Sequence, residues 1–264
     1  MARRIAVAAT APFGADVLER LAAEHHVVQL FTRPDRPRGR GRKLGAPPAK
    51  VVAERLGIPV EQPAKLDSSV GIAAHTVVVC AYGLLIPDEL LERALWLNVH
   101  PSLLPRWRGA APVERALMAG DDETGVTIHR TVEALDAGPI AAARAFPVAP
   151  EDDAGAVYAR AAGLAAELLR EVLAENEPIF EPQPEEGVTY AEKIRPEDRV
   201  LDPQAPAQEL VNRVRALSPH IGARLGDLIV WRARVAEDGS FEPLEVQPAG
   251  GRRMAYDAYL RGRR

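Results

Sequence analysis

Short apolar runs alternate with amphipathic stretches along the first part of the chain. The runs are rich in β-branched residues, and RIAVAA and TVVVCA are typical of buried strands. In the first stretch between them, Val17, Leu18 and Leu21 share one helical face. The pattern predicts strands at residues 4–9, 27–32, 59–61, 76–81 and 96–100, and helices at residues 15–25, 48–56 and 87–95. Since such alternation builds a mostly parallel sheet with helices on both faces, we predict a Rossmann-like α/β fold.

The pattern changes after residue 176. Before it, we predict a helix at 112–119, strands at 125–130 and 140–146, and a long helix at 154–175 that is rich in Ala, Leu and Glu. Residues 177–187 hold three prolines without a sustained period and are typical of a linker. Beyond them we predict a helix at 205–217 and two strands, 228–235 and 241–246, around an Asp-Gly turn. The expected organisation is a catalytic domain at 1–176, a linker at 177–188 and a small β-rich domain at 189–264.

The composition is that of an ordinary globular protein. The chain has 264 residues, 47% of them hydrophobic, and a formal net charge of −4. This balance argues against general nucleic-acid binding, so any such contact must come from a local patch. Cys80 is the single cysteine and cannot form an internal disulfide. We find no signal peptide, no membrane span and no metal-ligand spacing, and expect a cytoplasmic monomer.

Polar residues of catalytic type follow the strand at 96–100. Asn98 and His100 are two residues apart, so their side chains share a face at the carboxyl end of a predicted parallel strand. Open α/β sheets bind ligands beyond those ends. Asp136 precedes a Gly-Pro turn and is expected at the same edge. Such a trio suits acyl transfer: Asn98 and His100 donate to a developing oxyanion, and Asp136 orients the imidazole and helps remove a proton from the attacking amine.

Spacing alone leaves plainer interpretations open. A histidine at a strand end is often only part of a polar edge, and an aspartate beside Gly-Pro is often only a turn residue. His129, on the strand before Asp136, either lines the pocket or is structural, and we favour the structural interpretation. Trp107 either stacks on a ligand or packs.

The amino-acid sequence around His100 is a more specific indication of function than the spacing of Asn98, His100 and Asp136. The runs NVH, SLLP and RWRGAAP cover residues 98–112, and GVTI at 125–128 is followed by LDAGPI at 135–140. Together they resemble the signature of the folate-dependent formyltransferases. The resemblance implies that 10-formyltetrahydrofolate is the co-substrate and that Asn98, His100 and Asp136 are catalytic. It also implies a folate site lined by Ser102, Leu103, Leu104, Pro105, Tyr82, Gly83 and Leu84.

A basic loop follows the second predicted strand. Six cations stand there against Asp35 alone: Arg33, Arg36, Arg38, Arg40, Arg42 and Lys43. Glycines let such a loop follow a phosphate backbone, and each cation can release counterions from it. A solvated charged loop is the plainer interpretation. The loop resembles the one with which the tRNA-directed branch of the family grips its acceptor.

The last part of the chain also resembles that branch. TYAEKI at 189–194 and QPAGGRRM at 247–254 match the entry and the closing motif of a small β-barrel of the oligonucleotide-binding type (OB-like) that contacts tRNA. The stretch at 235–241 is short, so we expect a shortened barrel. The implied reaction is formyl transfer to the amino group of initiator methionyl-tRNA. Two alternatives are a formyltransferase for a nucleotide-linked amino sugar and a non-catalytic RNA-binding relative.

Overall fold

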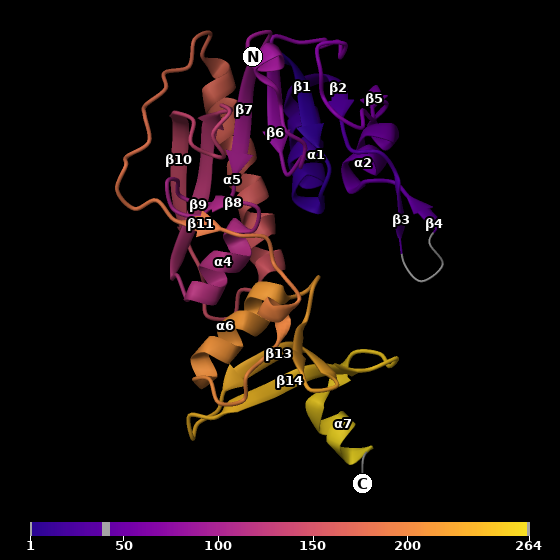
Figure 1. Ribbon diagram of the computed structural model, residues 1–264, viewed down its shortest axis with the longest axis vertical. Coiled ribbons are helices and arrows are strands. Elements are labelled where there is room, and N and C mark those ends of the chain that lie inside the picture. Colours follow the sequence, from indigo (N-terminus) through magenta and orange to yellow (C-terminus); the bar gives the residue numbers. More distant parts are fainter. Residues whose placement is uncertain (1, 39–42, 263–264) are drawn as a thin grey trace. The chain divides into compact units, whose positions relative to one another are not determined.

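The computed structural model describes residues 2–38 and 43–262 (Figure 1). A seven-stranded sheet dominates the first part, with strand order β10-β9-β7-β6-β1-β2-β5. The strands are β1 (Arg4–Ala9), β2 (His26–Phe31), β5 (Val60–Glu61), β6 (Thr76–Cys80), β7 (Leu95–His100), β9 (Glu123–Arg130) and β10 (Ile140–Pro147). The helices between and after them are α1 (Pro12–Glu24), α2 (Pro48–Leu56), α3 (Asp88–Leu91), α4 (Pro112–Ala119) and α5 (Ala154–Ala174).

The sheet is mostly parallel, which confirms the predicted fold class. β1 pairs in parallel with β2 and β6, β2 with β5, and β6 with β7. The β7–β9 pair is antiparallel. The chain passes from β1 to β2 on one side and later returns to β6 on the other. The carboxyl ends of β1 and β6 therefore flank the point where strand order reverses, which is where sheets of this kind bind ligands.

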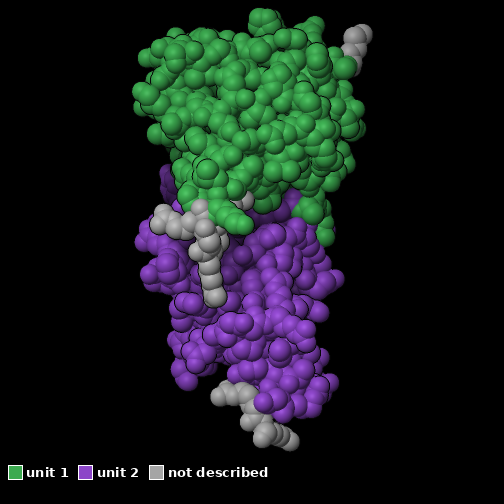
Figure 2. Space-filling model, turned by 90° about the vertical axis from the view of Figure 1, so that its right-hand side faces the viewer, with its two compact units in different colours: residues 1–108, 125–144, 159–188 green, residues 109–124, 145–158, 189–264 purple. Residues whose placement is uncertain are grey.

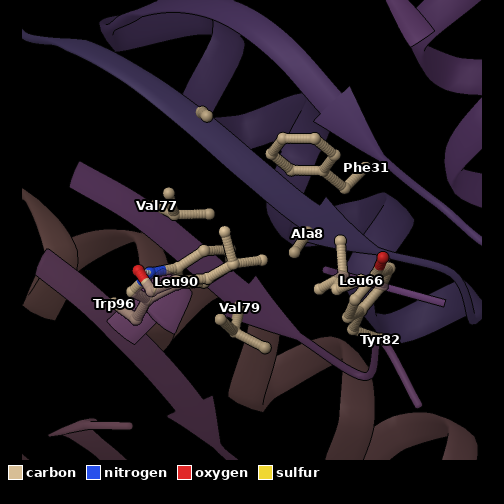
Figure 3. Close-up of a cluster of buried hydrophobic side chains, with 9 residues drawn as sticks. Ala8, Phe31, Leu66, Val77, Val79, Tyr82, Leu90 and Trp96 are labelled. Atoms are coloured by element: carbon tan, nitrogen blue, oxygen red, sulfur yellow. Dashed lines mark hydrogen bonds between the residues drawn. The ribbon is translucent and has the colours of Figure 1, made fainter. Parts of the chain in front are cut away.

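One face of the sheet carries a buried apolar cluster (Figure 3). Because side chains alternate along a strand, Ala6 and Ala8 of β1, and Val77 and Val79 of β6, point into it, as does Trp96 of β7. α3 and the neighbouring loops cover this face. The cluster consists of Ala6, Ala8, Phe31, Leu66, Val77, Val79, Tyr82, Leu90 and Trp96. It fixes the ends of β6 and β7, from which the polar residues of interest extend.

The helix predicted at 87–95 is wrong in length, since α3 ends at Leu91. The sequence there favours a helix, but Leu95 pairs with Thr76 at the start of β7. Trp96 Nε1 also donates to the carbonyl of Leu90 at 2.7 Å, which gives that carbonyl a partner outside the helix. Tertiary pairing overrides local propensity here.

Several short elements were not predicted. β3 (Arg36–Arg38) and β4 (Lys43–Gly45) form an antiparallel hairpin within the basic loop. The others are β8 (Arg108–Gly109), β11 (Tyr190–Ala191), the 3₁₀ helix Glu197–Arg199, β12 (Ala223–Leu225), β15 (Met254–Ala255) and α7 (Tyr256–Arg261). Each is too short to leave a periodic signal in the sequence.

The chain forms two compact units, coloured separately in Figure 2. Unit 1 comprises residues 1–108, 125–144 and 159–188, and unit 2 comprises residues 109–124, 145–158 and 189–264. The units are thus discontinuous, whereas the sequence suggested divisions at 176 and 188. Residues 177–188 group with unit 1.

Unit 2 contains a small antiparallel sheet of order β12-β13-β14-β15. Its long strands are β13 (Leu228–Val235) and β14 (Phe241–Pro248), and α6 (Ala207–Leu217) packs against them. The core of this sheet includes Leu210, Val214, Val230 and Val246. A separate antiparallel sheet of this kind agrees with the β-rich C-terminal part in the predicted fold class. None of the helices within residues 2–38 and 43–262 is long and apolar enough to cross a membrane.

Candidate active site

Asn98 and His100 lie at the carboxyl end of β7 on one face of the sheet. Asn98 is paired with Val79 of β6 on one side and with His129 of β9 on the other. His100 is paired with Thr127. Because directly opposed residues of neighbouring strands share a face, the register gathers four polar side chains at this edge.

Asp136 joins this group from the loop after β9. Its Oδ1 accepts a hydrogen bond from Asn98 Nδ2 at 3.1 Å, and its Oδ2 lies 3.7 Å from His100 Nδ1. Oδ1 is also 3.7 Å from Nε2 of His129. The structure thus brings together the three side chains that the sequence singled out, and adds a second imidazole. Their catalytic roles remain a prediction.

The backbone holds Asp136 in an uncommon conformation. Its φ of 49° lies in the left-handed region, which is costly for residues with a Cβ and least so for Asp and Asn. Two residues later, a Cβ on Gly138 would lie 1.8 Å from the carbonyl oxygen of Arg130, so only glycine fits. Strain of this kind persists where surrounding contacts enforce it, as at active sites.

The ring of His100 is oriented by a loop carbonyl. Its Nε2 lies 2.8 Å from the carbonyl oxygen of Trp107. A carbonyl only accepts, so Nε2 carries a proton and donates it. Nδ1 is the nitrogen that faces Asp136. The ring of Trp107 lies beside the guanidinium of Arg106, with 4.4 Å between that group and the ring centroid.

Two hydroxyl groups fix the loop after β7 from inside. Thr127 Oγ1 donates to the carbonyl of Ser102 at 2.7 Å and accepts from the N–H of Leu104 at 3.1 Å. Ser102 Oγ donates to the carbonyl of Arg106 at 2.7 Å. The role of Thr127 was not predicted from the sequence, where it lies between the apolar residues Val126 and Ile128.

The residues predicted to line the folate site occupy this loop and the turn after β6. Ser102 to Pro105 belong to the loop, and Tyr82 to Leu84 to the turn. Tyr82 is buried, and burial raises the pKa of its hydroxyl. Ser102 is fully buried and its hydroxyl is bonded within the loop. The side chains of Ser102 and Tyr82 therefore face inward, whereas Leu103, Pro105 and Leu84 are partly exposed.

Gln183 holds the Asp136 loop in place. Its Nε2 donates to the carbonyls of Asp136 and Gly138 at 2.7 and 2.8 Å. Its Oε1 accepts from Nε and Nη2 of Arg108 at 3.1 and 2.6 Å. Gln183 lies in the segment interpreted as a linker, and its proline-rich surroundings gave no sign of this role. The amide of Gln183 thus ties the strained turn to Arg108.

We expect Gln183→Leu to lower kcat about 10- to 100-fold, because a displacement of the Asp136 loop misaligns the carboxylate. The loss of these hydrogen bonds should also cost roughly 1–3 kcal/mol of unfolding free energy. Steady-state kinetics and thermal unfolding measure the two effects. The matched control is Glu185→Ala, an exposed residue of the same segment. Reduced stability with unchanged kcat would show that Gln183 serves folding alone.

The basic loop contributes cations of two kinds. Arg36 and Lys43, on the two strands of the β3–β4 hairpin, are exposed. Arg33 is partly buried at the hairpin base: a Cβ on Gly83 would lie 3.5 Å from its Nη1, and its Nε is buried without a hydrogen-bond partner. The backbone of Arg38 belongs to β3, while Arg40 and Arg42 lie outside the described residues. Their contact with tRNA remains a prediction.

A polar network anchors the hairpin base. Lys50 Nζ contacts both carboxylate oxygens of Asp35 at 3.0 and 2.9 Å and donates to Gln62 Oε1 at 2.9 Å. Gln62 Nε2 donates to Asp35 and to the carbonyl of Arg33. The single acidic residue of the basic loop is therefore paired with Lys50.

Comparison with known proteins shows the family of this chain. Residues 3–173 match the family model described as formyl transferase. The chain belongs to the formyl transferase family. Its relatives include the methionyl-tRNA formyltransferase of Halorhodospira halophila, which is 41% identical over an alignment that covers all of this chain and 97% of the relative. That of Aromatoleum aromaticum is 39% identical over 98% of this chain and 94% of the relative.

The alignment with the H. halophila formyl transferase is 303 positions long, while this chain has 264 residues. This chain therefore lacks residues that its relative has, in keeping with the short stretch at 235–241.

Solved structures share the fold at low sequence identity. The methionyl-tRNA formyltransferase of Clostridium thermocellum has a TM-score of 0.65 at 15% identity, covering 94% of this chain and 99% of that one. The N-formyltransferase of Helicobacter canadensis, solved with folinic acid and dTDP-3-aminofucose, has a TM-score of 0.66 at 16% identity, covering 89% of this chain and 88% of that one. At these identities the likeness concerns the fold of formyl transferases and does not choose the acceptor.

Proposed function

We propose that this formyltransferase moves the formyl group of 10-formyltetrahydrofolate to the amino group of methionine on initiator tRNA. The observation that carries the proposal is the meeting of Asn98, His100 and Asp136 within hydrogen-bonding reach of one small ligand at the carboxyl edge of the sheet. The names of relatives that match nearly the whole chain support the acceptor. We further propose that it acts as a monomer in the cytoplasm.

The residues divide the chemistry between them. Attack by the amine turns the formyl carbonyl oxygen into an oxyanion. Asn98 Nδ2 has two N–H groups; one donates to Asp136 and the other is suited to that oxyanion. Asp136 accepts the proton that the attacking ammonium must lose. When Nδ1 of His100 takes up a proton, the ring gains a second N–H. That N–H can pass its proton to the departing nitrogen of the folate.

The inward-facing side chains of Ser102 and Tyr82 bear on how the folate would be held. The loop at 101–108 and the turn at 81–84 both lie at the carboxyl edge, and the loop is fixed by Thr127. Rigid backbone N–H and C=O groups suit the flat, polar ring of a pterin. With the partly exposed Leu103, Pro105 and Leu84 beside them, the residues present fit the co-substrate.

A labelling experiment tests the acceptor. The enzyme is incubated with 10-formyltetrahydrofolate labelled in the formyl group and offered charged initiator methionyl-tRNA, uncharged tRNA or a nucleotide-linked amino sugar. We expect label only on the methionyl-tRNA. Label on the sugar alone would assign the acceptor class of the H. canadensis neighbour. No label on any acceptor would favour a non-catalytic RNA-binding protein.

The exposed cations of the hairpin are expected to raise affinity for the tRNA. Arg36→Ala combined with Lys43→Ala should increase KM for charged tRNA and leave kcat nearly unchanged. The slope of log KM against log salt should fall by about one for each phosphate that is no longer neutralised. Kinetics at several salt concentrations measure both effects. Lys65→Ala, an exposed lysine outside the hairpin, is the control. An unchanged KM would show that these two cations face solvent and do not contact the tRNA.

A further inference from the structure

A second imidazole, His129, lies beside the carboxylate of Asp136. His129 is 1% exposed and lies on β9, opposite Asn98 of β7. Its Nε2 is 3.7 Å from Asp136 Oδ1 and has no hydrogen-bond partner in the structure. The ring centroids of His129 and His100 are 6.4 Å apart, so the two imidazoles flank one carboxyl group. A buried polar atom without a partner calls for an explanation.

The other nitrogen of His129 settles which one carries the proton. Nδ1 lies 3.0 Å from the carbonyl oxygen of Arg130, which can only accept. Nδ1 is therefore the donor, and Nε2 of the neutral ring presents a lone pair. Burial lowers the pKa of His129; Asp136 opposes this shift, while His100 and Arg108 add to it. The ring is thus neutral near pH 7.

The same arrangement holds for His100. Each histidine donates one ring N–H to a main-chain carbonyl and turns its other nitrogen toward Asp136. In the neutral ring of His129, the nitrogen that faces Asp136 carries a lone pair, so no proton lies between it and an ionised carboxylate. An ionised Asp136 therefore leaves Nε2 of His129 without a hydrogen-bond donor. Nε2 becomes well satisfied when the carboxyl gains a proton, because the new O–H can donate to it.

We propose that His129 is a positioning residue that receives the O–H of Asp136 once that carboxylate has taken a proton from the acceptor. The inference rests on the proposed function. In the step, the N–H bond of the attacking ammonium breaks and its electron pair stays on nitrogen. The proton binds Asp136 Oδ1, and the resulting O–H donates to Nε2 of His129. The free amine then attacks the formyl carbon. His129 thereby favours proton uptake at a site buried from water.

Two substitutions separate this role from packing. His129→Leu removes the acceptor at similar volume, while His129→Gln keeps an acceptor oxygen. With leucine we expect kcat to fall about tenfold and the acid limb of the kcat/KM profile to move about one pH unit lower, since the protonated carboxyl loses its hydrogen-bond acceptor. Glutamine should restore most of both. His25→Leu, at a buried histidine just before β2, should change neither.

A measurement on the wild-type protein keeps the inference testable if a variant fails to fold. Nitrogen NMR of ¹⁵N-histidine enzyme, assigned with His129→Gln, should show His129 neutral and protonated at Nδ1 near pH 7. A proton on Nε2 in the free enzyme overturns the inference. So does a leucine variant that folds and keeps its pH profile, or one that glutamine does not rescue. Failure of the wild-type enzyme to formylate any acceptor would instead refute the proposed function. The NMR result does not depend on activity, so the two failures can be told apart.

Discussion

Replacing Asp136 with asparagine should lower kcat by about 10²- to 10⁴-fold without unfolding the protein. The amide has the shape of the carboxylate but cannot take a proton from the attacking ammonium. Asparagine also tolerates the left-handed backbone at this position, where φ is 49°. Single-turnover formylation at saturating substrates measures the chemical step, and equilibrium binding of tRNA and of a folate analogue should remain near wild type.

A second buried aspartate provides the control for this substitution. Asp152 is 8% exposed, and its Oδ2 accepts from the N–H of Ala149 at 2.8 Å. Asp152→Asn should lower thermal stability and leave kcat unchanged, because this carboxylate caps backbone rather than facing the site. Should Asp136→Asn turn over within a few-fold of wild type, Asp136 has no part in the proton transfer.

The strands of the large sheet were predictable because their signal is local. A run such as RIAVAA is apolar and β-branched throughout, and β1 spans the residues predicted. Helices α2 and α4 likewise match the predicted residues 48–56 and 112–119, each beginning at a proline and followed by glycine in the left-handed conformation. In these elements the propensity, the apolar pattern and the turn residues all favour the same structure.

The candidate site was predictable only in part. Asn98 and His100 share a face because they are two apart on one strand, which the sequence shows directly. The position of His129 depends on the antiparallel register of β7 and β9, which pairs it with Asn98. The place of Gln183 beside the site depends on its hydrogen bond to the carbonyl of Asp136, which is 47 residues away in the sequence. Neither relation leaves a trace in local periodicity, so the sequence could not place either residue beside Asp136.

The second large effect is expected at His100. His100→Gln should lower kcat by about 10²- to 10³-fold, since glutamine can donate to the Trp107 carbonyl but cannot take up and release a proton. The loop should therefore keep its place, and folate binding should change little. Rapid-quench measurement of the formylated product, together with the melting temperature, separates loss of chemistry from loss of structure.

His25 distinguishes this prediction from a general effect of altering a buried histidine. It is 9% exposed, and its Nδ1 accepts from the N–H of Arg3 at 3.2 Å. Burial lowers the pKa of its ring, as it does for His129, but the carboxylate that opposes this shift is Glu24 for His25 and Asp136 for His129. His25→Gln should thus leave kcat unchanged. If both variants lost activity equally, the defect would lie in packing; if His100→Gln retained near wild-type kcat, the imidazole would only hold the loop, and proton transfer would belong to Asp136 and its other neighbours.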